Sequence, residues 1–97
     1  GERVADLPVT STKSLVGHLL GAAGALEAVA TILCLMASEV HAMPDDGTTD
    51  PATRLRLVLG RPLPLAGARH ALSTSLAFGG ANAALVFTRH GAHDVGR

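Results

Sequence analysis

A lysine and a histidine, Lys13 and His18, stand five residues apart just ahead of a glycine- and alanine-rich run, Gly21-Ala22-Ala23-Gly24-Ala25. Small residues let neighbouring backbones approach closely, so we expect both side chains to lie at a tightly packed place with little water. A neutral imidazole can accept a proton or donate a hydrogen bond to an oxygen that gains negative charge. The pair is therefore a candidate for acid–base or electrostatic catalysis, and a purely structural histidine is the alternative.

A long helix follows these two residues. The run Leu19–Ala37 consists of good helix formers and carries one charge, Glu27. We predict a helix that begins between Ser14 and His18 and continues to about Glu39. Its apolar residues surround most of the circumference, which predicts burial on more than one face. A helix that starts at His18 also favours the neutral imidazole, because a helix N-terminus carries partial positive charge.

Lys13 needs a carboxylate partner if it is buried, and Glu27 is the only acid between Asp6 and Glu39. On a straight helix, nine residues place Glu27 about half a turn and roughly 13 Å from His18, so these two do not share a face. Glu27 meets Lys13 only if the segment before the helix folds back along it. Otherwise the sequence holds a surface lysine and a helix glutamate that never meet, and both possibilities stay open.

Short strands are expected in the second half of the chain. Arg54–Leu59 alternates polar and apolar residues, which is typical of a half-exposed strand. His70–Leu76 and Ala83–Thr88 are rich in β-forming residues, and a turn with Gly79 and Gly80 separates them. Adjacent glycines permit a positive φ and a close approach of the backbone. Residues 70–89 are therefore predicted to form an antiparallel pair.

The composition excludes several classes of function. The 97 residues are 47 % hydrophobic with a formal net charge of zero, so nothing indicates binding of nucleic acid or of an anionic membrane. The single cysteine, Cys34, excludes an internal disulfide and is compatible with a reducing cytosol. Because it lies in the middle of an apolar helix, we interpret it as a buried structural thiol. The five histidines show no zinc spacing, so we predict no metal site.

The apolar run is close to the length of a membrane span, and a small membrane-associated helical protein is one hypothesis. A core helix is the better interpretation, because Glu27 would lie in the middle of the span and no aromatic belt or basic flank is present.

Two motifs resemble a known family. Lys13-Ser14-x-x-Gly17-His18, continued as Leu19-Leu20-Gly21-Ala22-Ala23-Gly24-Ala25-Leu26-Glu27, is similar to the lysine–histidine motif of β-ketoacyl-[acyl-carrier-protein] synthases. These are the elongating condensing enzymes of type II fatty-acid synthesis and the ketosynthases of polyketide assembly. Ser75-x-x-Phe78-Gly79-Gly80-x-Asn82-Ala83 resembles their late Phe-Gly-Gly loop. The resemblance covers nearly the whole chain, aligned to the last quarter of such a synthase. It implies a thiolase-like layered α/β fold, in which residues 1–97 form a long buried helix plus antiparallel strands of the C-terminal part and no independent domain.

The resemblance also implies a reaction, the decarboxylative Claisen condensation of malonyl-acyl-carrier protein with an acyl thioester. His18 would bond the malonyl thioester oxygen as it gains charge. Lys13, paired with Glu27, would hold the surrounding electrostatics. Phe78, with the two glycines after it (Gly79 and Gly80), would gate the acyl pocket, and its backbone N–H would help form the acyl oxyanion hole.

Cofactors and partners follow from the same resemblance. No cofactor is expected on the protein, because acyl and malonyl groups arrive on the phosphopantetheine of acyl-carrier protein. The expected partners are that carrier, the N-terminal part of the same synthase and a second ketosynthase-like subunit in a homodimer or heterodimer, in the cytoplasm and without nucleic acid or membrane.

Departures from the family pattern qualify this picture. The nucleophilic cysteine and the first histidine of the family belong to segments that this chain does not contain, and Cys34 matches neither, so the chain alone should be inactive. Leu76 stands where Phe is usual and Ala77 where Gly is usual; Ala77 would be strained if its backbone needed a positive φ. The alternative is a non-catalytic ketosynthase-like partner of the chain-length-factor type. Retention of both Lys13 and His18 favours the enzyme.

Overall fold

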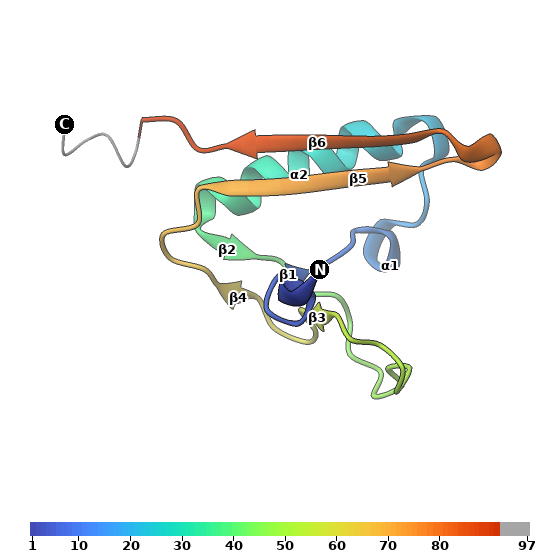
Figure 1. Cartoon of the computed structure of the whole chain (residues 1–97), viewed down its shortest axis with the longest axis horizontal. Helices are drawn as coiled ribbons and strands as arrows, with labels where there is room; N and C mark the ends of the chain where they lie inside the picture. Colours follow the sequence, from blue (N-terminus) through green and yellow to red (C-terminus); the bar gives the residue numbers. More distant parts are fainter. Residues whose placement is uncertain (92–97) are drawn as a thin grey trace.

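The architecture described here is that of a computed structural model, which describes residues 1–91. A helix, α2, lies along one face of a long hairpin, and the N-terminal segment and the middle of the chain form small strand pairs beside them (Figure 1). In chain order the elements are η1 (Glu2–Ala5), β1 (Pro8–Val9), α1 (Lys13–Val16), η2 (Leu20–Ala22), α2 (Ala23–Ala37), β2 (Glu39–Val40), β3 (Arg56–Leu57), β4 (Leu63–Pro64), β5 (His70–Leu76), η3 (Phe78–Gly80) and β6 (Asn82–Thr88).

The predicted single helix is two helices with a break between them. The short α1 ends at Val16, and the chain passes through a 3₁₀ turn before α2 begins at Ala23. Gly17 has φ 80° and Leu20 has φ 51°, and left-handed backbone at these residues cannot continue a right-handed helix. The predicted start between residues 14 and 18 is therefore wrong, and α2 ends two residues before the predicted Glu39.

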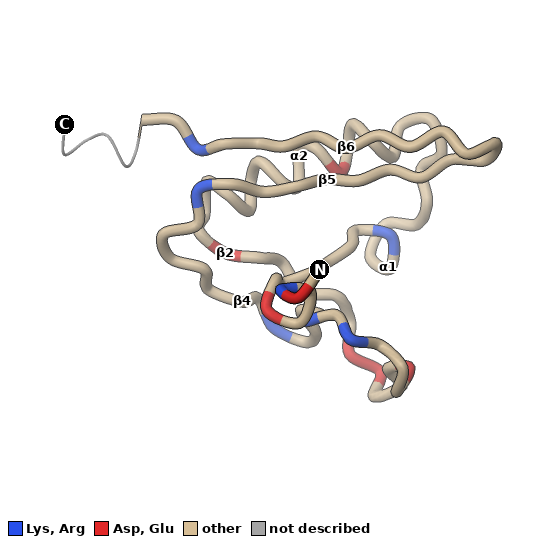
Figure 2. The backbone as a smooth tube through the Cα atoms, viewed as in Figure 1, with Lys and Arg blue, Asp and Glu red and all other residues tan. Residues whose placement is uncertain are grey.

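The predicted antiparallel pair is confirmed. β5 and β6 pair from His70 opposite Thr88 to Leu76 opposite Asn82. Inner positions of β5 are occupied by alanine and serine, and these small side chains let α2 approach closely: a Cβ built on Gly24 would stand 3.8 Å from Ser75 Oγ. The hairpin carries no charged residue along either strand, whereas most charges gather around η1, β3 and the loop before β3 (Figure 2).

The remaining strands are two residues long. β1 pairs in parallel with β3, and β2 pairs antiparallel with β4. Of the predicted strand Arg54–Leu59, only Arg56–Leu57 forms a strand, and Leu59 adds an isolated bridge to Met43. These pairs tie the N-terminal segment to the middle of the chain.

The prediction that α2 is buried on more than one face is wrong for the described residues. Its buried residues are Ala23 and Leu35, while Leu33 and Met36 are 57 % and 65 % exposed. The hairpin covers one face of the helix, and the described residues provide no second layer of that size. By length and composition alone the window Leu20–Ala37 could also cross a membrane, a property that core helices and signal sequences share.

Candidate functional site

The lysine and the glutamate of the sequence motif meet. Lys13 Nζ donates to Glu27 Oε2 at 2.6 Å, which joins the first residue of α1 to the second turn of α2. The side chain of Lys13 is 44 % exposed and that of Glu27 is 15 % exposed. Of the two possibilities left open by the sequence, the folding back of the segment before the helix is the one that occurs. The ion pair therefore links α1 to α2 across the break at residues 17–22.

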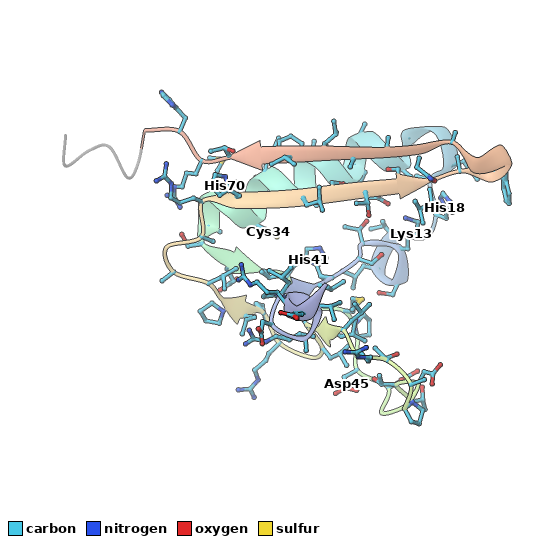
Figure 3. All side chains as sticks on the ribbon, in the orientation of Figure 1. Lys13, His18, Cys34, His41, Asp45 and His70 are labelled. Atoms are coloured by element: carbon cyan, nitrogen blue, oxygen red, sulfur yellow. The ribbon has the colours of Figure 1, made fainter. Side chains whose placement is uncertain are left out.

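His18 lies inside this break and not at the start of a long helix, so the predicted dipole environment is wrong. Its nearest backbone partner is local: the N–H of Leu20 donates to His18 Nδ1 at 3.1 Å. Because Nδ1 accepts this hydrogen bond, the proton of the neutral ring resides on Nε2. His18 is exposed in this chain, and Figure 3 shows it on the same side of the molecule as Lys13, below the end of the hairpin that carries the turn. The ring thus has a donor, Nε2–H, free to face a ligand.

The predicted gate residues form the tip of the hairpin. Gly79 and Gly80 both have φ 84°, as the Gly-Gly turn predicted. Ala77 has φ −122° and ψ 161°, an extended conformation that any residue adopts. The backbone strain considered for Ala77 is therefore absent. Its N–H donates to Ala81 O at 2.8 Å and closes the base of the turn. Phe78 is fully exposed at the tip, with its side chain against solvent in this chain.

A further feature, an apolar cavity of about 310 Å³, was missed by sequence reasoning. It lies between α1 and α2, and Leu15, Leu26 and Leu33 are among its lining residues. Cys34 also lines it and is a free, half-buried thiol, less enclosed than predicted. The break between the helices borders this space, so the signal that could have found it is Gly17 inside an otherwise helical run.

Two other histidines, His41 and His70, make hydrogen bonds with threonines and not with Lys13 or His18. His41 O accepts from Thr10 Oγ1 at 2.8 Å, and His70 Nδ1 bonds the Thr88 hydroxyl at 3.0 Å at the far end of the hairpin (Figure 3). Within residues 1–91 no group of His, Cys, Asp or Glu side chains could hold a metal ion.

The described residues thus form a helix-and-strand α/β arrangement with a carboxylate-paired lysine, Lys13, and an exposed histidine, His18, in the segment that joins α1 to α2. Comparisons with known proteins give the particular family. A family profile described as "Beta-ketoacyl synthase, C-terminal domain" matches residues 1–45. The sequence is homologous to the C-terminal part of β-ketoacyl synthases, as its two motifs predicted.

Individual relatives agree with this family. The chain is 42 % identical over 82 residues to the chloroplastic 3-oxoacyl-[acyl-carrier-protein] synthase II of Arabidopsis thaliana, covering 84 % of this chain and 15 % of that protein. It is 43 % identical over 89 residues to the 3-oxoacyl-[acyl-carrier-protein] synthase 2 of Staphylococcus aureus (strain COL), covering 92 % of this chain and 21 % of that protein. The chain thus spans about a fifth or less of the length of these relatives.

Proposed function

We propose that this chain supplies the lysine–histidine part of the active site of a condensing enzyme. The reaction joins a malonyl unit on acyl-carrier protein to an acyl thioester by decarboxylative Claisen condensation. The observation that carries the proposal is the hydrogen bond from the Leu20 N–H to His18 Nδ1, which leaves Nε2–H as a donor. An oxygen that gains charge during the reaction requires a donor of this kind.

The chemistry follows from that donor. When the carboxyl carbon–carbon bond of the malonyl thioester breaks, carbon dioxide leaves and the electron pair moves towards the thioester oxygen. His18 Nε2–H stabilises this oxygen by a hydrogen bond. The enolate carbon then attacks the acyl thioester, whose carbon–sulfur bond breaks to release the thiolate of the nucleophile. In this scheme the Phe78 N–H assists at the acyl carbonyl, and Phe78 with Gly79 and Gly80 opens or closes the acyl pocket.

Lys13 has a supporting role in the proposal. Its ammonium is anchored by Glu27 at 2.6 Å, and this ion pair fixes α1 against α2 on either side of the segment that carries His18. A fixed positive charge beside the reacting centre favours the negative charge that develops there. Glu27 acts on the lysine and not on the substrate.

Other parts of the synthase complete the site. The nucleophilic cysteine and the first histidine would come from a preceding segment, within a thiolase-like fold and a homodimer or heterodimer. Cys34 lies in mid-helix beside an apolar cavity and is not proposed as the nucleophile. The relatives are named as synthases that act with acyl-carrier protein, and this carrier would deliver both substrates on its phosphopantetheine. We expect a cytoplasmic enzyme without a bound cofactor.

A chimera tests the proposal. In it, this chain replaces the 89-residue segment that it matches in the Staphylococcus aureus relative. We expect the chimera to release carbon dioxide from malonyl-acyl-carrier protein and to condense, and His18→Ala to lower both rates about 10²- to 10⁴-fold. His70→Ala is the matched control, because His70 lies on an exposed strand position far along the hairpin. Wild-type rates for His18→Ala would refute the proposal. A folded but inactive chimera would instead favour the non-catalytic partner subunit.

A further inference from the structure

The loop before β3, residues 44–53, contains the one aspartate–glycine pair of the sequence, Asp46-Gly47. All residues of this loop are exposed, and in Figure 1 the loop stands away from α2 and the hairpin. A Cβ built on Gly47 would meet no atom of the described residues within 4 Å, apart from its own chain neighbours. The backbone of this pair is therefore open to water and free to rearrange.

An aspartate followed by glycine can rearrange without an enzyme. The backbone nitrogen of the glycine attacks the aspartate Cγ, and the hydroxyl of the protonated carboxyl group leaves as water together with the proton of that nitrogen. Water then opens the resulting five-membered succinimide. If it breaks the original peptide bond, the main chain runs through Cγ as isoaspartate, and the mass is unchanged. Glycine favours ring closure because it has no Cβ to obstruct the approach of its nitrogen.

Two hydrogen bonds restrain the carboxyl group of Asp46. Its Oδ1 accepts from the Thr48 N–H at 2.9 Å and from the Thr48 hydroxyl at 2.6 Å. Both bonds favour the charged carboxylate. The charged form does not close the ring, because an oxide ion is a far poorer leaving group than the hydroxyl of the neutral acid. The two bonds also fix the direction of the carboxyl group, on which ring closure depends.

The attacking nitrogen is restrained as well. The Gly47 N–H donates to Asp45 Oδ1 at 2.9 Å, so a neighbouring carboxylate holds the proton that ring closure must remove. These bonds all lie within an exposed loop, and such loops open locally without unfolding of the remaining structure. The contacts therefore slow the rearrangement and do not prevent it.

The same loop contains two aspartates for comparison, Asp45 and Asp50. Each accepts a hydrogen bond from the N–H two residues later, as Asp46 does, at 2.9 Å in all three cases. They differ in the residue that follows. Asp50 precedes Pro51, which has no N–H to lose, and Asp45 precedes Asp46, whose side chain obstructs the nitrogen. Three exposed carboxylates thus share one kind of turn, and one of them has a glycine as its neighbour.

We propose that Asp46-Gly47 is a site of isoaspartate formation in the folded protein, and that the hydrogen bonds from Thr48 set its rate. The modification is an intramolecular isomerisation that needs water and no cofactor or partner. It adds one main-chain carbon to the loop that joins β2 to β3. This loop carries none of the residues proposed for catalysis, so the inference is independent of the proposed function.

Ageing of the chimera for several weeks at physiological pH and temperature tests the site. Peptide mapping with electron-transfer fragmentation locates isoaspartate in samples taken at intervals. We expect it to accumulate at Asp46 and to stay at its starting level at Asp45 and Asp50. Asp46→Glu is the matched control, because a glutamate would have to close a six-membered ring, and it should abolish the isoaspartyl signal from this loop. Unfolding in guanidinium chloride should accelerate the reaction at Asp46, because both restraints are then lost.

Variants of Thr48 test the restraint. Thr48→Ala removes the hydroxyl bond and should raise the rate of isoaspartate formation about 2- to 5-fold, the rate equivalent of one exposed hydrogen bond. Thr48→Ser retains a hydroxyl and should keep the wild-type rate. If Asp46 stays unmodified in the folded chimera, or if Asp45 or Asp50 isomerises as fast, the proposed site is refuted. Equal rates for Thr48→Ala and Thr48→Ser would refute the role of the Thr48 hydroxyl.

Discussion

The ion pair between Lys13 and Glu27 should respond unequally to loss of its two partners. Glu27 is 15 % exposed and Lys13 is 44 % exposed. Lys13→Met leaves a mostly buried carboxylate without its cation, which we expect to cost about 2 kcal/mol of unfolding free energy. Glu27→Gln leaves a half-exposed ammonium that water can solvate, so its cost should be about 0.5–1 kcal/mol, discounted for solvent screening.

A double-mutant cycle separates the interaction from these desolvation effects. The double variant Lys13→Met/Glu27→Gln should be destabilised less than the sum of the single variants, by about 1 kcal/mol. Urea unfolding of the chimera, at unchanged m-value, measures the free energy of unfolding of the wild type, the two single variants and the double variant. Glu39→Gln is the control, because Glu39 is an exposed strand residue. The coupling should fall in 1 M salt, because exposed charges are screened there.

Two results would refute this reasoning. A Glu27→Gln variant that is less stable than Lys13→Met would show that the carboxylate is not the buried partner. A coupling below about 0.3 kcal/mol would show that the two groups act independently. In either case the ion pair would not hold α1 against α2, and its supporting role near His18 would be lost.

Two more predictions concern Arg89, after β6, and Asp46, in the loop before β3. Arg89 Nη1 donates to Leu35 O at 3.1 Å and to Ser38 Oγ at 2.9 Å at the C-terminus of α2, so Arg89→Met should cost about 1–2 kcal/mol in urea unfolding; an unchanged midpoint would contradict this. The hydroxyl and the N–H of Thr48 both donate hydrogen bonds to the Asp46 carboxylate, and these bonds, the hydroxyl's first, hold the pKa of that carboxyl below its ordinary value. The associated stability is present above the unfolded-state pKa and lost as pH falls through the folded one. Thr48→Ala should therefore raise the Asp46 pKa in an NMR titration; coincident curves would contradict it.

The hairpin could be predicted from the sequence because its determinants are local. Each strand carries its own β-forming residues, and Gly79-Gly80 specifies a turn with positive φ regardless of what packs on it. The same locality explains why the turn was predicted better than the strand Arg54–Leu59, of which only Arg56–Leu57 forms a strand and Leu59 makes an isolated bridge. Strand formation depends on a neighbour, and alternation alone does not supply one.

Burial of the long helix could not be predicted from its composition. Apolar residues all round α2 indicate a helix that can be covered on several sides, but the covering layers must come from elsewhere. Within residues 1–91 only the hairpin offers a broad surface, so Leu33 and Met36 remain exposed. This is consistent with a chain that spans about a fifth or less of its relatives' length, in which further layers would be available.

The break between α1 and α2 is what allows Lys13 and Glu27 to meet, and it explains why the sequence left their contact open. On an uninterrupted helix these residues, fourteen apart, would be separated by about 21 Å along the axis, far beyond the reach of both side chains. Gly17 ends α1 with φ 80° and ψ 179°, a conformation essentially confined to glycine.

Gly17→Ala should therefore cost about 1–3 kcal/mol or extend α1, which would move Lys13 away from Glu27 and displace His18. No atom lies within 4 Å of a Cβ at this position, so the cost would come from the backbone and not from a clash. Gly21→Ala is the matched control, because it meets nothing within 4 Å and does not require a positive φ; it should change stability by less than about 0.5 kcal/mol. Unfolding and carbon dioxide release by the chimera measure both effects. If Gly17→Ala proved as harmless as Gly21→Ala, the break would not be set by Gly17, and the geometry of the Lys13–His18 pair would need another cause.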